Sequence, residues 1–206
     1  MITVIDIGMG NIGSVARALK FLDIAHTVCA EPAGVRSAGA LILPGVGSFA
    51  EATRRLAASG MDDAITDSVK VRQTPILGIC LGMQLLATSG DEGAEGAPVS
   101  GLGLIRGHVA ALRRNDPSLR IPHMGWNDVQ GGSMAMFAGV PNGACFYFVH
   151  SYAIQLDEDI PYATADYGGE VVAAVASGPV WGAQFHPEKS QDAGLQVLRN
   201  FVALAC

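Results

Sequence analysis

Two short motifs of this chain carry a thiol, an imidazole and a carboxylate that together could perform nucleophilic catalysis. Residues 75–84 read Pro-Ile-Leu-Gly-Ile-Cys-Leu-Gly-Met-Gln and place Cys80 between two glycines. Residues 184–188 read Gln-Phe-His-Pro-Glu and supply His186 and Glu188. A thiolate is a strong nucleophile, an imidazole can take its proton, and a carboxylate can orient the imidazole and stabilise its charged form. The residue types predict a cysteine enzyme with Cys80 as the nucleophile.

Cys80 is expected at a sharp corner between a strand and a helix. The apolar run at residues 76–79 predicts the strand, and residues 81–88 predict the helix. Such a corner lifts a side chain out of the sheet edge, and Gly78 and Gly82 would keep the approach to it clear. The helix N-terminus would favour the anionic form of the sulfur.

The base motif separates His186 from Glu188 by one proline. In an extended backbone, residues two apart share a face, so the carboxylate could orient the imidazole. The alternative is a strand end followed by a polar turn. The remaining cysteines and histidines are interpreted as structural, because isolated cysteines are commonly small buried hydrophobes. They are Cys29, Cys145, Cys206, His26, His108, His123 and His150.

A tetrahedral intermediate also needs hydrogen-bond donors for its oxyanion. The segment Leu-Pro-Gly-Val-Gly, at residues 43–47, lies between an expected strand and an expected helix. Its glycines permit unusual backbone angles and a close approach to a ligand. The alternative is an ordinary glycine-rich turn. No Gly-Lys-Ser/Thr follows, so the segment is not a phosphate loop.

In the first half of the chain, which carries the nucleophile motif, predicted strands alternate with predicted helices. Strands are predicted at 2–6, 27–29, 40–43 and 76–79, and helices at 12–22, 49–58 and 62–71. Short strands are predicted later, at 103–112, 143–155, 162–167, 171–176 and 180–184, before a helix at 192–204. Residues 89–100 are predicted to be a surface loop. The pattern indicates an α/β fold, a mainly parallel sheet flanked by helices with an antiparallel strand extension.

Composition narrows the class of protein. The 206 residues suit a single domain, 1–206, and 50% hydrophobic with 16% charged residues argues against disorder. A net charge of -6 argues against nucleic-acid binding, and Arg113 with Arg114 is interpreted as a solvated loop. Four scattered cysteines fit a reducing cytoplasm, the N-terminus resembles a first strand, and no apolar run has membrane-spanning length. We expect a cytoplasmic protein without metal or organic cofactor, nucleic-acid partner or membrane contact.

Taken together, the motifs at 78–84 and 185–188 resemble those of the class I glutamine amidotransferases, which use a Cys-His-Glu triad. Three further stretches narrow the resemblance: 44–47, 122–127 and 147–152. They are similar to the family of glutaminase subunits of imidazole glycerol phosphate synthase, in histidine biosynthesis. The resemblance runs from residue 8 to residue 190, and it implies a flavodoxin-like amidotransferase fold.

This resemblance implies that glutamine is hydrolysed to glutamate and ammonia. Ammonia would pass to a separate (β/α)₈-barrel cyclase subunit, which forms imidazole glycerol phosphate and an aminoimidazole carboxamide ribotide. Cys80 would be the nucleophile, His186 the general base and acid, and Glu188 the residue that orients His186. The two subunits would form a heterodimer.

The resemblance also assigns residues to the substrate and the partner. Gly45, Val46 and Gly47 would form the oxyanion strand, where a peptide flip could switch the enzyme on when the partner binds. Glutamine would contact Gln84, Ser151 and Tyr152, and Glu92 would meet its α-ammonium. The partner interface would include Asn11, Trp126, Tyr147 and Lys189. Plainer interpretations are a helix-surface Gln84, a solvated Glu92, and core aromatics at Trp126 and Tyr147.

Other functions fit some of these observations. A glutaminase subunit of another synthase shares the triad, but residues 123–127 argue against it. A γ-glutamyl hydrolase acting alone also fits the triad, but the chain lacks obvious secretory features. A non-catalytic binding module on the same fold would not require an intact triad, and a redox-sensing cysteine protein would need neither His186 nor Glu188.

Overall fold

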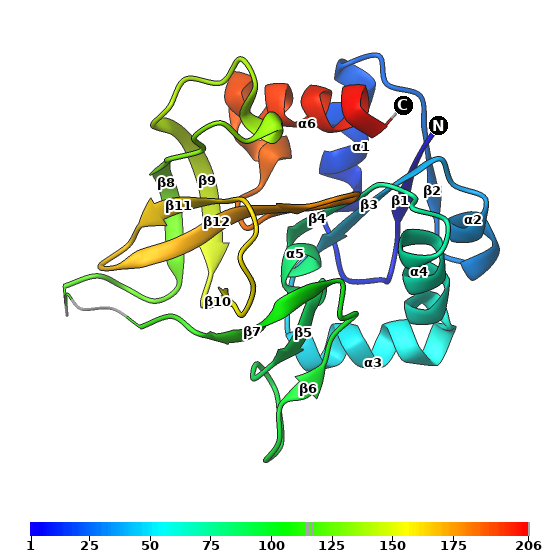
Figure 1. Cartoon of the computed structure of the whole chain (residues 1–206), viewed down its shortest axis with the longest axis horizontal. Helices are drawn as coiled ribbons and strands as arrows, with labels where there is room; N and C mark the ends of the chain where they lie inside the picture. The colour runs from blue at the N-terminus through cyan, green and yellow to red at the C-terminus, as the bar shows by residue number, and fades with distance from the viewer. Residues whose placement is uncertain (114–115, 117, 206) are drawn as a thin grey trace.

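The structure is a computed structural model that describes residues 1–113, 116 and 118–205 (Figure 1). Arg114 and Cys206, both interpreted above, lie outside the described residues. The helices are α1 (Ile12–Phe21), α2 (Pro32–Arg36), α3 (Phe49–Ser59), α4 (Met61–Lys70), α5 (Leu81–Leu85) and α6 (Gln191–Ala205), with 3-10 turns η1 (Ala135–Phe137) and η2 (Pro187–Lys189). Among the described residues, no helix has both the length and the apolar character needed to cross a membrane.

Within the described residues, the strands form three sheets. The first six strands are β1 (Ile2–Ile5), β2 (His26–Cys29), β3 (Ala40–Gly45), β4 (Ile76–Cys80), β5 (Ala87–Gly90) and β6 (Val99–Ser100). The others are β7 (Ile105–Ala111), β8 (His123–Val129), β9 (Ala144–His150), β10 (Tyr152–Leu156), β11 (Tyr162–Asp166), β12 (Glu170–Ser177) and β13 (Val180–Ala183).

The largest sheet has seven strands in the order β11-β12-β13-β4-β3-β1-β2. The strands from β13 to β2 run parallel to their neighbours, whereas β12 and β11 join in antiparallel pairs. The fold prediction, a mainly parallel sheet with an antiparallel extension, is therefore confirmed. Figure 1 shows α1 and α6 on one face of this sheet and α3, α4 and α5 on the other.

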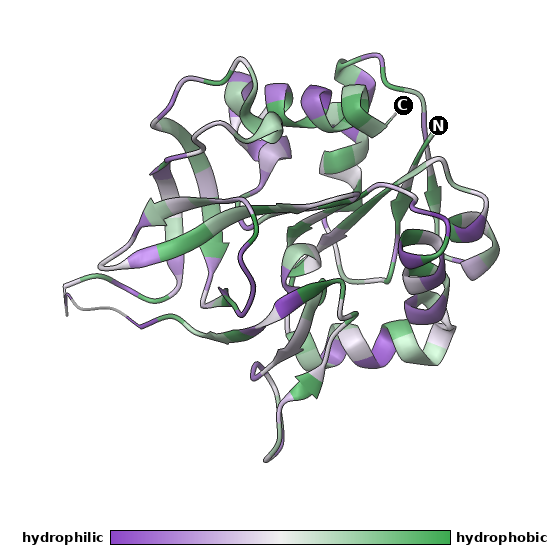
Figure 2. Ribbon diagram, viewed as in Figure 1, coloured by the Kyte–Doolittle hydropathy of each residue, from purple (hydrophilic) through white to green (hydrophobic). Residues whose placement is uncertain are grey.

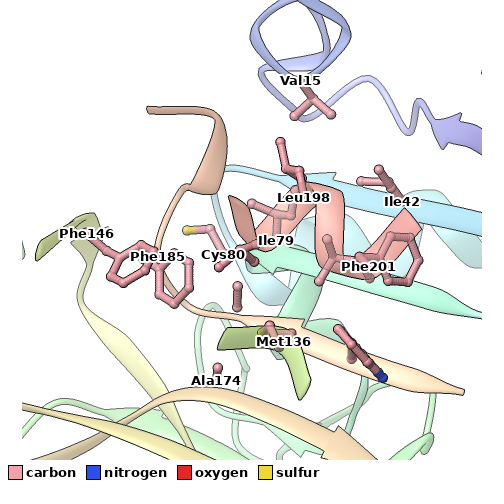
Figure 3. Packing of buried hydrophobic residues seen from close by; sticks show 14 of the residues in the cluster. Val15, Ile42, Ile79, Cys80, Met136, Phe146, Ala174, Phe185, Leu198 and Phe201 are labelled. Atoms are coloured by element: carbon pink, nitrogen blue, oxygen red, sulfur yellow. The ribbon is translucent and has the colours of Figure 1, made fainter. Parts of the chain in front are cut away.

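Each face of the sheet has its own apolar core. One core joins α1 and α6 to the sheet and includes Cys80, Phe146 and Phe185, as Figure 3 shows. The other core joins the helices α2, α3, α4 and α5 to the opposite face of the sheet. The central strands are buried along their whole length, and Figure 2 shows them mainly hydrophobic while the helices carry hydrophilic outer surfaces. A strand buried on both faces has a continuous apolar run. The apolar residues 76–79 therefore predicted β4 correctly.

The prediction of a helix at residues 81–88 is wrong beyond its first turn. Helix α5 ends at Leu85, and β5 begins at Ala87. The amides of Leu104 and Ile105 both donate to the carbonyl of Leu86, at 2.8 and 2.9 Å. Pairing with this distant segment overrides local helix propensity. The predicted loop at residues 89–100 also forms strands at both ends, β5 and β6, which pair with each other.

The single strand predicted at residues 143–155 is two strands. It divides at Ser151, because β9 pairs with β8 whereas β10 pairs with β7 of the four-stranded sheet β10-β7-β5-β6. Strand β8 and helix α2 were not predicted. The polar residues of β8 and its Gly125, with φ of 133°, mask the alternation expected of a strand.

Candidate active site

The predicted oxyanion segment, nucleophile and base lie at the carboxyl ends of three neighbouring parallel strands. Gly45 at the end of β3 is in register with Cys80 at the end of β4, and Ala183 of β13 is in register with Ile79. Residues that follow β13 therefore reach the same sheet edge from the other side of β4. In open α/β sheets the carboxyl ends of the strands form the binding crevice.

Cys80 occupies a strained turn between β4 and α5. Its φ and ψ are 54° and -112°, a region that side chains other than glycine rarely adopt. The two adjacent glycines serve packing, which corrects the expectation that they clear the approach for substrate. A Cβ atom on Gly82 would lie 1.7 Å from the carbonyl oxygen of Leu43, and one on Gly78 would lie 2.6 Å from that of Gly82. Only glycines let α5 pack this closely on β3 and β4.

His186 and Glu188 form the predicted pair. The Nδ1 atom of His186 lies 2.8 Å from Oε1 of Glu188, and both side chains are buried, at 2% and 1% exposure. The backbone is not extended as expected: Glu188 lies in the 3-10 turn η2, which brings its carboxylate back to the imidazole. The amide of His186 donates to the carbonyl of Tyr147 at 2.9 Å, which anchors the turn to β9.

The charge state of His186 follows from its neighbours. Burial alone would lower its pKa, but Cys80 and then Glu188 act in the opposite direction and raise the pKa of His186 to about 9. The Nε2 atom is buried and has no hydrogen-bond partner within bonding geometry among the described residues. Cys80 therefore acts on the imidazole from close by, without a hydrogen bond of full geometry. His186 is protonated at neutral pH.

A cavity of about 290 Å³ lies over Cys80, close to the lower limit of roughly 300 Å³ for small-molecule pockets. Most of the predicted site residues line it: Cys80, Val46, Gly47, Gln84, Glu92, Ser151 and Tyr152. Gly45, His186 and Glu188 do not line it. Leu81 does, and sequence analysis overlooked it. The backbone amide directly after a nucleophile at such a strand-to-helix turn (a nucleophile elbow) is a usual oxyanion donor. The expected turn at Cys80 could therefore have indicated Leu81.

The predicted oxyanion strand is only partly arranged for an oxyanion. The amide of Val46 donates to the carbonyl of Met9 at 3.2 Å, so that hydrogen bond would have to break before Val46 could serve. Gly47 has a φ of 110°, which favours glycine.

Glu92 is not a solvated loop carboxylate. Its Oε2 accepts a hydrogen bond from the amide of Phe49 at 3.1 Å, at the first residue of α3, and its backbone carbonyl accepts from Ala50. Burial raises the pKa of Glu92, while the bond from Phe49 acts against this rise. Its neighbour Asp91 is held by His108, with Oδ2 and Nε2 2.9 Å apart. Glu92 therefore caps α3 and faces the cavity from a fixed position.

Gln84 is buried and not a helix-surface residue. Its Nε2 donates to the carbonyl of Tyr152 at 2.8 Å and to Oε1 of Gln184 at 3.0 Å. Gln184 in turn approaches the sulfur of Cys80, with Nε2 and Sγ 3.8 Å apart. Sequence analysis did not assign Gln184 a role, although it stands two residues before His186 in the base motif.

Three of the predicted interface residues gather beside the active site. The rings of Trp126 and Tyr147 meet edge to face at 6.1 Å, and Nζ of Lys189 lies 5.4 Å from the centre of the Tyr147 ring. Trp126 is 49% exposed, so it is not a core aromatic. Asn11 immediately precedes α1, which contacts the η2 turn that carries Lys189. Their role in docking stays a prediction.

His123 and His150, interpreted above as structural, are not isolated from each other. They face each other in register on β8 and β9, and His150 lines the cavity. The residues that the structure describes contain no group of three or more His, Cys, Asp or Glu side chains able to hold a metal.

Comparison with known proteins agrees with this geometry. The family model "Glutamine amidotransferase class-I" matches residues 3–205. The chain is 41% identical over 205 residues to imidazole glycerol phosphate synthase subunit HisH 1 of Campylobacter jejuni (strain RM1221), covering 99% of this chain and 100% of that one. It is 45% identical over 208 residues to subunit HisH of Herpetosiphon aurantiacus, covering 100% of this chain and 95% of that one.

Solved structures show the same fold at lower identity. A crystal structure of a glutamine amidotransferase superposes with a TM-score of 0.76 at 22% identity, covering 98% of each chain. The structure of PurLQS from Thermotoga maritima gives a TM-score of 0.71 at 18% identity, covering 100% of this chain and 98% of the matched one.

Proposed function

Because the chain belongs to the class-I glutamine amidotransferase family, and within it to the HisH subunits, we propose that residues 1–206 form one glutaminase domain that hydrolyses glutamine at Cys80. The products are glutamate and ammonia, and the ammonia serves imidazole glycerol phosphate synthesis in histidine biosynthesis. The observation that supports this most is the Cys80 elbow beside the buried His186–Glu188 pair, at the floor of a cavity of suitable size.

The reaction follows from the positions of these groups. The sulfur of Cys80 attacks the side-chain amide carbon of glutamine, and amides near Val46 and Leu81 stabilise the oxyanion. His186, already protonated, gives its Nε2 proton to the departing nitrogen, so the carbon–nitrogen bond breaks and ammonia leaves a γ-glutamyl thioester. Water then attacks the thioester while His186 takes its proton. Cleavage of the carbon–sulfur bond releases glutamate, and Cys80 and His186 return to their starting states.

The cavity wall supplies contacts for the rest of the substrate. The Glu92 carboxylate attracts the α-ammonium, because its remaining oxygen can accept a hydrogen bond from a cation. The backbone at Ser151 and Tyr152 contacts the amino acid moiety. Gln84 has both amide hydrogens engaged, so its carbonyl oxygen is the group that can accept from the substrate.

The test of this assignment is covalent labelling of Cys80. Treatment with the chloroketone analogue of glutamine should give one adduct, and mass spectrometry of the peptides should locate it on Cys80. The Cys80→Ala variant serves as the control and should stay unlabelled. Labelling that persists in this variant would overturn the assignment.

The partner that receives ammonia is a (β/α)₈-barrel cyclase, with which the chain forms a heterodimer in the cytoplasm. Trp126, Tyr147, Lys189 and Asn11 form the docking surface. Binding of the cyclase and its nucleotide ligand favours the arrangement in which the peptide at Val46 leaves Met9 and donates to the oxyanion. One missing oxyanion donor lowers a rate by about 10²–10³.

Glutamine hydrolysis is therefore slow in the isolated chain and fast in the complex. Rates should be measured with and without the cyclase and its ligand, and then with Trp126→Ala and Lys189→Ala. Full activity of the isolated chain, or variants that dock and activate normally, would contradict the proposed switch. These outcomes leave the assignment of Cys80 untouched.

A further inference from the structure

A continuous chain of hydrogen bonds runs from β8 to the active site through two buried histidines. The Nδ2 atom of Asn127 lies 3.2 Å from Nε2 of His123, and Nδ1 of His123 lies 2.9 Å from Nε2 of His150. The Nδ1 atom of His150 lies 2.8 Å from the carbonyl oxygen of Tyr152. His123 and His150 are only 2% and 6% exposed.

The direction of this chain is fixed at both ends. A carbonyl oxygen can only accept, so Nδ1 of His150 carries the hydrogen that reaches Tyr152, and its Nε2 accepts from Nδ1 of His123. At the other end, Oδ1 of Asn127 accepts from the amide of Asp128 at 2.9 Å, which identifies Nδ2 as the donor to His123. Both ends require the same state, in which each imidazole is neutral and protonated on Nδ1.

The chain continues beyond Tyr152 to the nucleophile. The carbonyl oxygen of Tyr152 has two lone pairs, one accepting from His150 and the other from Gln84. The second amide hydrogen of Gln84 goes to Gln184, whose own amide nitrogen lies 3.8 Å from the sulfur of Cys80. One side of the cavity, at His150, Tyr152 and Gln84, thus belongs to a single network that begins at Asn127.

We infer that His123 and His150 are positioning residues for glutamine hydrolysis, which orient the Tyr152 carbonyl and, through it, the two glutamine side chains beside Cys80. This inference rests on the proposed function and adds to it the residues that hold the substrate wall in place. A charged imidazole in either position would set a donor against a donor and break the chain.

The surroundings hold both rings in this neutral state. The ring of His123 stacks between those of Phe148 and Tyr167, with centroid distances of 4.6 and 3.9 Å. Burial is the main cause that lowers the pKa of His123 and of His150 to about 4, and charge on His186 lowers that of His150 further. The hydrogen bond from His150 to Tyr152 acts against this lowering but does not reverse it.

Nuclear magnetic resonance can test the chain without reference to catalysis. Long-range ¹H–¹⁵N correlation of the full chain, labelled at histidine, should show His123 and His150 as neutral Nδ1–H tautomers at neutral pH. An Nε2–H tautomer or a doubly protonated ring at either position would overturn the inference. This result does not depend on whether glutamine is the substrate.

Labelling of Cys80 tests the positioning role. In the His150→Phe variant, the concentration of the glutamine chloroketone that gives half-maximal labelling rate should rise by about 10-fold, as expected for the loss of one buried hydrogen bond. Iodoacetamide does not use the contacts that bind glutamine, so its rate of alkylation of Cys80 should change by less than about 2-fold. The His150→Asn variant keeps a donor near the Nδ1 position and should recover part of the affinity.

A matched control separates positioning from loss of stability. Val197→Ala weakens the apolar core at α6 and should leave the half-maximal concentration unchanged. The inference fails if His150→Phe labels like the unmodified chain, if His150→Asn recovers nothing, or if Val197→Ala gives the same change. An unmodified chain that is not labelled at Cys80 would instead overturn the proposed function, while the tautomer measurement would still stand. If His150→Phe does not fold, the tautomers and His150→Asn decide.

Discussion

His186 and His150 are both buried histidines near Cys80, yet their neighbours give them opposite charge states. His186 lies between a thiol and a carboxylate, and its pKa is raised to about 9. His150 lies between a neutral imidazole and a backbone carbonyl, and its pKa is lowered to about 4. Burial opposes the charge in both cases, so the difference comes from the partners. His186 can donate a proton to a leaving group, whereas His150 can only orient its hydrogen-bond partners.

The charged histidine also affects the neutral one. The positive charge of His186 contributes to the lowered pKa of His150, which keeps the second ring neutral beside an active site that cycles protons. Residue type and burial therefore do not distinguish a proton donor from a positioning group. The charge and hydrogen-bonding capacity of the immediate partners do.

The largest expected effect comes from replacing the sulfur of Cys80 beside His186. Cys80→Ser should lower glutamine hydrolysis by on the order of 10⁴-fold or more, because an alkoxide forms far less readily than a thiolate. The raised pKa of His186 should fall, while the tautomers of His150 and His123 should stay as they are. Activity assays with a histidine NMR titration would check both statements. A His186 titration that does not move would contradict the role of Cys80 in its charge.

Replacing the carboxylate beside His186 should have a smaller effect. Glu188→Gln keeps the shape but removes the negative charge 2.8 Å from Nδ1, so we expect kcat to fall by on the order of 10²–10³. KM for glutamine should change little, because the carboxylate does not line the cavity. Steady-state kinetics of the complex would check this. A rise in KM with an unchanged kcat would place Glu188 in substrate binding instead.

Glu92 extends the comparison to a half-buried carboxylate whose pKa is raised by burial and whose expected cation is the substrate itself. Glu92→Gln should raise KM for glutamine by about 10-fold, the scale of one charge-assisted hydrogen bond. The reactivity of Cys80 toward iodoacetamide should not change. Kinetics and alkylation of the same protein preparation would show this split. An unchanged KM would reject the contact with the α-ammonium.

The smallest expected effect is on the pH dependence of stability, where the two histidine sites act in opposite directions. An unfolded histidine has a pKa near 6.5, whereas folded His150 and His123 have pKa values of about 4. These two residues therefore lower the free energy of unfolding as the pH falls from about 6.5 to about 4. His186, with a folded pKa of about 9, contributes fully below about 6.5 and loses its contribution as the pH rises through 9. Urea unfolding across this range should show both slopes.

Variants separate the two slopes. His123→Phe should flatten the acid side by removing one of the two neutral rings, and His186→Gln should flatten the alkaline side. Because carboxylates also titrate in acid, the quantity to compare is the difference between each variant and the unmodified chain. If the free energy of unfolding had the same slope against pH in His123→Phe and in the unmodified chain between pH 4 and 6.5, the lowered pKa of His123 would be contradicted.

The sequence predicted those parts of the fold and site that depend on local pattern. The buried strands of the parallel sheet are apolar runs, and Cys80, His186 and Glu188 stand in compact motifs. It failed where distant pairing decides. Residues 86–88 look helical, but their backbone groups form hydrogen bonds with β7 and with the segment at residues 101–104 that precedes it. His123 and His150 lie 27 positions apart, and only the β8–β9 register brings them together.

The hydrogen bond from Phe49 to Glu92 has a consequence for the entropy of binding. Freezing a flexible side chain on association costs about 0.5–1.5 kcal/mol. The Glu92 carboxylate is already held by the first amide of α3, so this loss of rotamer freedom occurs during folding. If glutamine binds as proposed, its ammonium group meets a preorganised carboxylate, and the helix that holds this carboxylate begins four residues after Gly45.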